Sequence, residues 1–136
     1  LEDRQKPITQ IKERNMENAL NWFEIPASDI ERAKKFYNTI FEFELIPMPA
    51  MEGFEMGMFP VEDGVSGAVI QGEGYIPSME GSVVYLHGGD DLSVVLDRVE
   101  AAGGQIILPK TGIGENGFMA YFKDSEGNRV GLHSRG

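Results

Sequence analysis

The sequence predicts an α+β fold made of two tandem βαβββ modules. Segments 21–41 and 83–103 follow one pattern, in which a short apolar strand leads to an acidic helix start and an amphipathic helix. Aligning Asp29 with Asp91 gives an offset of 62 residues (91 − 29), close to half of the 136-residue chain. This duplication indicates two similar halves around one core, and we expect a small-molecule site at the seam between them.

The first module is expected at about residues 18–71. A strand at Asn18–Ile25 ends at Pro26, and Ser28 with Glu31 has the spacing of a capping box at the start of a helix. The helix carries an apolar stripe at Ile30, Ala33, Phe36, Tyr37, Ile40 and Phe41. Three further strands are predicted at Phe43–Pro49, Phe54–Phe59 and Gly67–Gln71.

The second module is expected at about residues 82–134, after a glycine-rich connection at Gly72–Gly81. A strand at Ser82–Leu86 precedes a helix capped by Asp90 or Asp91 and ended by Gly103 and Gly104. The apolar stripe of this helix is Leu92, Val95, Leu96, Val99 and Ala102. The remaining strands are predicted at Gln105–Leu108, Phe118–Lys123 and Arg129–Ser134.

One glycine pattern has the spacing of a dinucleotide-binding motif but not the structural context that this motif needs. Gly112, Gly114 and Gly117 match its spacing, but Phe118–Phe122 after them has a strand pattern, whereas that motif needs a helix there. We therefore interpret residues 110–117 as a hairpin or a mobile lid, in which Lys110 and Glu115 are candidates to contact a ligand.

Composition excludes several classes of function. The net charge of −10 argues against binding to nucleic acid or to an anionic membrane surface. The absence of cysteine excludes disulfides and thiolate sites and fits a cytoplasmic protein. Residues 1–15 are interpreted as an N-terminal appendage or linker, and residues 16–136 as a single domain.

Three segments together point to a known family. Trp22–Tyr37, Val99–Lys110 and Asp124–Ser134, the last with the sequence DSEGNRVGLHS, resemble the vicinal oxygen chelate superfamily. That superfamily includes glyoxalase I, bleomycin resistance proteins and extradiol dioxygenases. The resemblance implies a glyoxalase-like fold, with the paired modules forming an open cupped barrel around a pocket, and a homodimer.

The resemblance also implies where a divalent metal would be held, namely by side chains of the first and last strands of each module. In this sequence those positions are Trp22 and Val84 in the first strands and lie near Ala68 and Gly131 in the last strands. None of these four side chains binds metal, and Gly131 stands where the family usually has a carboxylate. No metal or other cofactor is expected; the alternative is an atypical divalent metal site formed by His87, His133 and an acid such as Glu24.

The candidate pocket residues come from equivalent strands of both modules. Trp22 and Glu24 alternate onto one strand face, where Glu24 could act as an acid or base, or could bind a cation. The third strands contribute methionines and a tyrosine, which suit an adaptable apolar pocket. The predicted ligand pocket is therefore Trp22, Glu24, Met56, Met58, Met119, Tyr121 and His133.

Three functions remain open from the sequence. The first is a small-molecule pocket protein related to glyoxalases and bleomycin resistance proteins, without the usual metal. The second is a related lyase, isomerase or dioxygenase that uses Glu24 as the catalytic residue or an atypical metal site. The third is a ligand-sensing module of a larger regulatory protein.

Overall fold

The computed structural model describes residue 16 and residues 18–136, so the expected appendage at residues 1–15 lies outside the described part. The βαβββ order occurs twice, as predicted. The first module consists of β1 (Trp22–Pro26), α3 (Ile30–Phe41), β2 (Ile46–Met48), β3 (Glu55–Met58) and β4 (Ser66–Gln71). The second consists of β5 (Tyr85–His87), α4 (Ser93–Leu96), β6 (Gln105–Gly112), a 3-10 turn η1 (Gly114–Asn116), β7 (Phe118–Lys123) and β8 (Arg129–Ser134).

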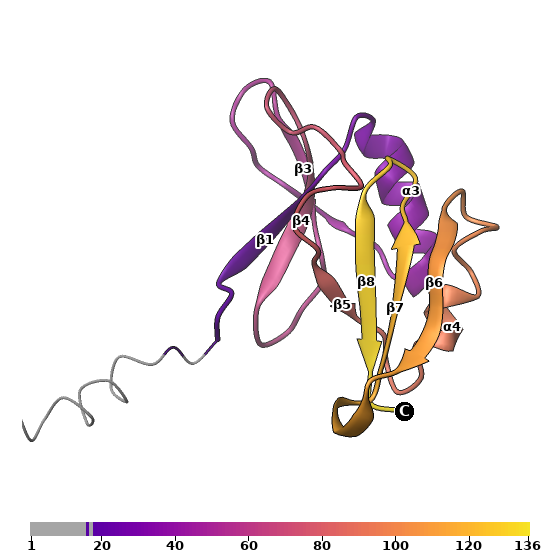
Figure 1. The fold of residues 1–136 in the computed structure, drawn as a ribbon. Coiled ribbons are helices and arrows are strands. Elements are labelled where there is room, and N and C mark those ends of the chain that lie inside the picture. Colours follow the sequence, from indigo (N-terminus) through magenta and orange to yellow (C-terminus); the bar gives the residue numbers. More distant parts are fainter. Residues whose placement is uncertain (1–15, 17) are drawn as a thin grey trace, which may run out of the picture.

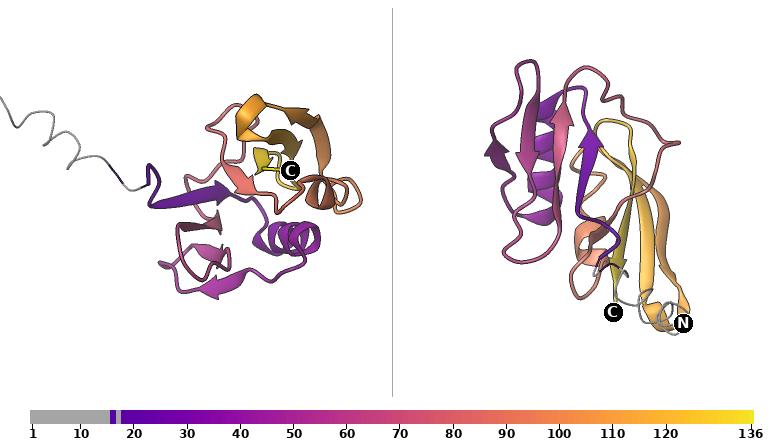
Figure 2. Two further views of the ribbon diagram at one scale, coloured as in Figure 1. Left: turned by 90° about the horizontal axis from the view of Figure 1, so that it is seen from below. Right: turned by 90° about the vertical axis from the view of Figure 1, so that its left-hand side faces the viewer.

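Each module forms one four-stranded sheet with the same topology. The strand orders are β1-β4-β3-β2 and β5-β8-β7-β6, and in each sheet only the first strand pairs in parallel, with the module's last strand. The two sheets lie side by side (Figure 1), and α3 and α4 contact each other between the modules (Figure 2). The α+β prediction is confirmed, whereas the sheets are not closed into a barrel, because the described residues form no ladder between β1 and β5.

Helix α3 supplies a large part of the core that both modules share. Five residues of its predicted stripe are buried, and Phe41 is partly buried. Its aromatic side chains reach across the module boundary, since the rings of Phe36 and Phe122 lie 5.8 Å apart. Burying each of these large apolar side chains contributes about 1.5–3 kcal/mol, so separating the modules would expose the core of both.

The start of α3 differs from the predicted capping box. Asp29, rather than Ser28, is the N-cap, and its side chain accepts a hydrogen bond from the backbone N–H of Arg32. The backbone N–H groups of Ser28 and Asp29 instead donate to the carboxylate of Glu126, at 2.8 and 2.9 Å. A residue of the second module therefore completes the cap of the first module's helix.

Glu126 belongs to the turn Asp124–Asn128 between β7 and β8, which we call the clamp turn. Asp124, 2% exposed, accepts hydrogen bonds from the hydroxyl of Tyr37 at 2.7 Å and from the side chain of Asn128. Asn128 also donates to the carbonyl of Pro26 at the end of β1. Burial and the neighbouring Asp124 carboxylate together raise the pKa of Tyr37 well above its usual value, so this phenol stays protonated as a donor.

Other helices and strands have bounds that differ from the predicted ones for local reasons. α4 covers only four residues of the predicted second helix, and the chain then continues to Gly103 as hydrogen-bonded turns. Its stripe is still buried at four of five positions, while three valines in this stretch lower its helix propensity. β5 begins at Tyr85 rather than Ser82, and β6 runs on to Gly112, so part of the predicted lid is strand.

No helix among the described residues is both long and apolar enough to cross a membrane.

Glu126→Gln tests the clamp turn. The Glu126 side chain is fully buried and receives a bidentate contact from Arg32 at 2.7 and 3.0 Å. Because hydrogen bonds to a charged group are lost, we expect the free energy of unfolding at neutral pH to fall by about 1–3 kcal/mol in denaturant melts. Glu100→Gln, which removes an exposed carboxylate, is the matched control and should change little.

The pH dependence of this loss has a defined sign. Burial acts to raise the pKa of Glu126, but hydrogen bonds from Arg32, Asp29 and Ser125 outweigh it and lower the pKa below its ordinary 4.5. The carboxylate therefore stabilises the fold above pH 4.5 and loses that contribution as the pH falls through the lowered pKa. The difference between wild type and Glu126→Gln should shrink in acid; a constant difference would contradict this role.

Candidate functional site

Strand alternation gives each sheet one face packed on the core and one face turned away from it, which we call the open face. Directly paired residues share a face, so the ladders place Glu24, Ala68 and Met58 together in the first sheet. The second sheet places Tyr85, Gly131 and Tyr121 together in the same way. The predicted equivalence of the third strands is confirmed, because Met58 and Tyr121 occupy matching ladder positions.

One predicted register position is wrong by a residue. Val84 packs against the core, and the open-face residue of the second module's first strand is Tyr85, opposite Gly131. The counterpart of Tyr85 in the first module is Glu24, which lies opposite Ala68; Trp22 does not occupy that position. The offset of 62 taken from Asp29 and Asp91 does not hold for the first strands, where Glu24 and Tyr85 are equivalent at an offset of 61 (85 − 24).

Gly131 is required by the ring of Tyr85. A Cβ atom at Gly131 would lie 2.6 Å from Cδ2 and 3.0 Å from Cγ of that ring, closer than real Cβ atoms approach. The aromatic ring therefore fills the space into which a side chain at position 131 would project. A carboxylate at this position, as the family resemblance implies, cannot coexist with Tyr85 in this orientation.

Tyr85 forms a hydroxyl pair with Tyr121. The two phenol oxygens are 2.6 Å apart, and the guanidinium carbon of Arg129 lies 5.5 Å from the centre of the Tyr121 ring. The hydrogen bond to Tyr121, together with partial burial, raises the pKa of Tyr85 to about 12. Tyr85 is therefore a neutral phenol at physiological pH and can take part in hydrogen bonds as a donor.

Glu24 is held in place on the open face of the first module. One of its carboxylate oxygens accepts from Trp22 Nε1 at 3.3 Å, and the other accepts from the hydroxyl of Tyr75 at 2.6 Å. The bond to Glu24 also raises the pKa of Tyr75. Sequence reasoning missed Tyr75, because it lies in the irregular connection between the modules, where no periodicity marks a functional side chain.

The predicted pocket residues do not line a single cavity. Glu24 and Met56 line a cavity of 500 Å³ in the first module, together with Phe54, Ile70 and Tyr75. Met119 and His133 line another of 540 Å³ in the second module. Trp22, Met58 and Tyr121 lie on the open face but line neither cavity. A smaller cavity of 220 Å³ at the seam has Glu24 and Arg129 in its wall.

The residues present do not fit a divalent metal. His87 and His133 are neighbours across β5 and β8, but each has a ring nitrogen engaged by the backbone. His133 Nε2 donates to the carbonyl of Asn116 at 2.6 Å, and His87 Nδ1 accepts from the N–H of Gly89 at 2.9 Å. Within the described residues, no group of three His, Cys, Asp or Glu side chains converges to hold a metal.

The two candidates in the predicted lid have different surroundings. Lys110 pairs with Asp91 at 2.9 Å and lies over the ring of Phe118, with its nitrogen 4.4 Å from the ring centre. The hydrogen bond from Lys110 is the main cause that lowers the pKa of Asp91 to about 2. Lys110 thus has a partner within the protein, whereas Glu115 lies exposed on η1.

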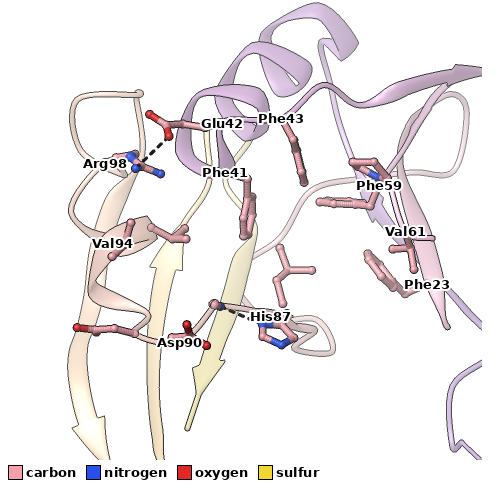
Figure 3. A pocket seen from close by; sticks show the side chains of 16 residues that line it. Phe23, Phe41, Glu42, Phe43, Phe59, Val61, His87, Asp90, Val94 and Arg98 are labelled. Carbon is pink, nitrogen blue, oxygen red and sulfur yellow. Dashed lines mark hydrogen bonds and ion pairs between the residues drawn. The ribbon is translucent and has the colours of Figure 1, made fainter. Parts of the chain in front are cut away.

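A separate apolar cavity of 660 Å³ opens between the modules, beside the core (Figure 3). Phe23, Phe59 and Val61 approach it from the first module, and His87 and Val94 from the second. Arg98 bridges the modules at its rim, donating to Glu42 and to the carbonyl of Ile40. Sequence reasoning missed this cavity, because phenylalanines that line a gap and those that fill a core have the same pattern.

Gly131→Ala tests whether Tyr85 excludes a side chain at this position. We expect a loss of about 1–3 kcal/mol in the free energy of unfolding, because the added methyl overlaps the ring. Gly81→Ala is the matched control, since an added Cβ there meets nothing within 4 Å. In a Tyr85→Ala background the Gly131→Ala substitution should cost no more than this control; an equal cost in both backgrounds would contradict the proposed overlap.

Comparisons with known proteins agree with this architecture. Residues 20–61 match the family described as bleomycin resistance protein-like N-terminal. A glyoxylase-like domain-containing protein of Didymella fabae is 30% identical over 126 residues, covering 85% of this chain and 93% of its own. A Mycobacterium tuberculosis protein named as a glyoxylase is 30% identical over 118 residues, which cover 82% of this chain. The chain spans only 44% of that relative's length.

Solved structures show the same fold. A glyoxalase/bleomycin resistance protein from Streptomyces sp. CB03234 matches with a TM-score of 0.64 and 27% identity, over 83% of this chain and 97% of its own. Glyoxalase I from Zea mays matches with a TM-score of 0.63 and 21% identity, over 85% of this chain and 46% of its own. With the repeated βαβββ topology, these similarities show that the chain belongs to the vicinal oxygen chelate superfamily, the family of the glyoxalases and bleomycin resistance proteins.

Proposed function

We propose that this protein binds an amphipathic small molecule on its open face and does so without a metal ion. The observation that carries the proposal is the set of residues at the four equivalent ladder positions: Glu24, Ala68, Tyr85 and Gly131. Ala68 and Gly131 offer no ligand atom in a side chain, only Glu24 carries a carboxylate, and the tyrosine ring occupies the space over the glycine. The polar groups that remain are suited to holding a ligand by hydrogen bonds and charge.

The surroundings of Glu24 support a binding role. Both of its oxygens already accept hydrogen bonds, so the carboxylate has a fixed position and is preorganised to receive a donor or a cation. Apolar side chains surround it in the 500 Å³ cavity, among them Met51, Phe54 and Met56. Methionine side chains adapt to ligands of different shape, which suits a binding protein of broad specificity.

The single tryptophan allows a direct test. Trp22, 39% exposed, donates to Glu24, so a ligand that reaches Glu24 changes the environment of the indole. We expect a saturable change in tryptophan fluorescence for some members of a panel of amphipathic amines, glutathione adducts and catechols. Metal analysis of the purified protein should find no stoichiometric zinc, nickel, iron or manganese. Stoichiometric metal that requires His133, or a panel without any saturable response, would contradict the proposal.

Glu24→Gln is the variant that assigns the site. Because the amide keeps the shape and loses the charge, we expect about tenfold weaker binding of a cationic ligand, equivalent to about 1.4 kcal/mol. Glu44→Gln, at an exposed carboxylate that lines none of these cavities, should bind as wild type. If Glu24→Gln binds normally while Val94→Asn weakens binding, the ligand occupies the cavity of Figure 3 instead. Turnover of a bound compound that Glu24→Gln abolishes would instead support the enzyme hypothesis.

A further inference from the structure

We propose that the second module's open face holds an acidic oxygen of the ligand, a carboxylate or a similar oxyanion, between the Tyr85–Tyr121 hydroxyl pair and Arg129. The inference rests on the proposed function and narrows its ligand class. The ligand is an amphipathic acid, and it is zwitterionic where a cationic group also reaches Glu24.

The hydroxyl pair has one hydrogen-bond donor to spare. In a contact between two phenols, one O–H donates to the other oxygen, and the second O–H is free to donate elsewhere. No other side-chain hydrogen bond involves Tyr85 or Tyr121 among the described residues. Both hydroxyls lie on the open face, so the remaining donor is available to an acceptor atom of a ligand.

Arg129 adds an unmatched positive charge at the same place. Its buried Nε atom has no hydrogen-bond partner, and within the part of the chain that the structure describes no carboxylate lies within ion-pair distance of its guanidinium. A buried donor of a charged group that stays unpaired costs free energy, and an anion beside the guanidinium offsets part of that cost. A ligand oxyanion can accept from the terminal nitrogens of this guanidinium and from the free phenol together.

The charged side chains around Arg129 also favour a site for an oxyanion. Four of the described cations pair with carboxylates, namely Arg32, Lys34, Arg98 and Lys110. By contrast, Lys123 lies opposite Arg129 on the neighbouring strand, and Arg135 lines the adjoining cavity with His87 and His133. Lys123 and Arg135 thus add positive charge near Arg129 in a protein whose net charge is −10. Glu24 shares the seam cavity with Arg129, which places the acceptor for a ligand's cationic end beside the anion site.

The test uses a matched pair of probes, phenylbutyrate and phenylbutyramide, which share an apolar body and differ in charge. Isothermal titration calorimetry should show the acid binding about tenfold more tightly than the amide, the ratio that one charge-assisted contact gives. Added salt should reduce the ratio. Arg129→Met, which removes the cation, should bring the ratio close to one. The double variant Tyr85→Phe with Tyr121→Phe, which keeps both rings and removes both hydroxyls, should lower the ratio, because no phenol donor then remains. Lys35→Gln, which removes an exposed cation on α3, should keep the wild-type ratio.

The results of these titrations distinguish failure of the oxyanion site from failure of the proposed binding function. If the amide binds as tightly as the acid, or if the preference for the acid survives unchanged both in Arg129→Met and in the double variant Tyr85→Phe with Tyr121→Phe, the oxyanion site is wrong while the binding function stands. If neither probe binds and the wider ligand panel leaves Trp22 unchanged, the proposed function fails and this inference fails with it. If Arg129→Met does not fold, the double variant Tyr85→Phe with Tyr121→Phe carries the test, because it keeps both aromatic rings and removes only the hydroxyls.

Discussion

The clamp turn Asp124–Asn128 is the contact on which the arrangement of the two modules depends. It connects β7 to β8 in the second module, yet its side chains bind the start of α3, the hydroxyl of Tyr37 and the end of β1. These bonds satisfy donors and acceptors that burial between the modules would otherwise leave unpaired, and a buried unpaired group costs about 1–3 kcal/mol. The clamp turn is thus a connector between the two modules in this structure.

This connector also determines the geometry of the candidate site. β1 carries Glu24 two residues before Pro26, whose carbonyl accepts from Asn128. β8 begins with Arg129 immediately after Asn128, so one hydrogen-bonded contact fixes both strands at the seam. Because the two sheets share no ladder among the described residues, side-chain contacts of this kind set the distance between an acid on one sheet and a cation on the other. Weakening the clamp turn would therefore disturb the geometry of the proposed ligand site as well as stability.

Local patterns in the sequence predicted the helices and strands well. No pattern in the sequence predicted the contacts between residues far apart in the chain. The stripe of α3 and the bounds of β7 and β8 follow from helical periodicity and strand alternation, which neighbouring residues alone determine. The bond from Ser28 to Glu126 spans 98 residues and leaves no periodic signal. The error at Val84 has a different origin, because a shift of one residue between the strand offset and the helix offset reverses which side chains face the core. Tyr75 was missed because its role comes from where an irregular segment passes in space.

The glycine at position 131 and the Tyr85–Tyr121 pair depend on each other in this protein. Tyr85 can lie over position 131 only because that residue is glycine, and its hydroxyl then meets Tyr121 beside Arg129. A carboxylate at position 131 would both collide with the ring and pair with the arginine, removing the donors that the open face now offers. Placing a metal ligand at position 131 would thus require changes at positions 131 and 85 together, with further ligands on the first sheet, where Ala68 offers none. In the second module, the ring that occupies the space over Gly131 also supplies one of the polar groups we assign to ligand binding.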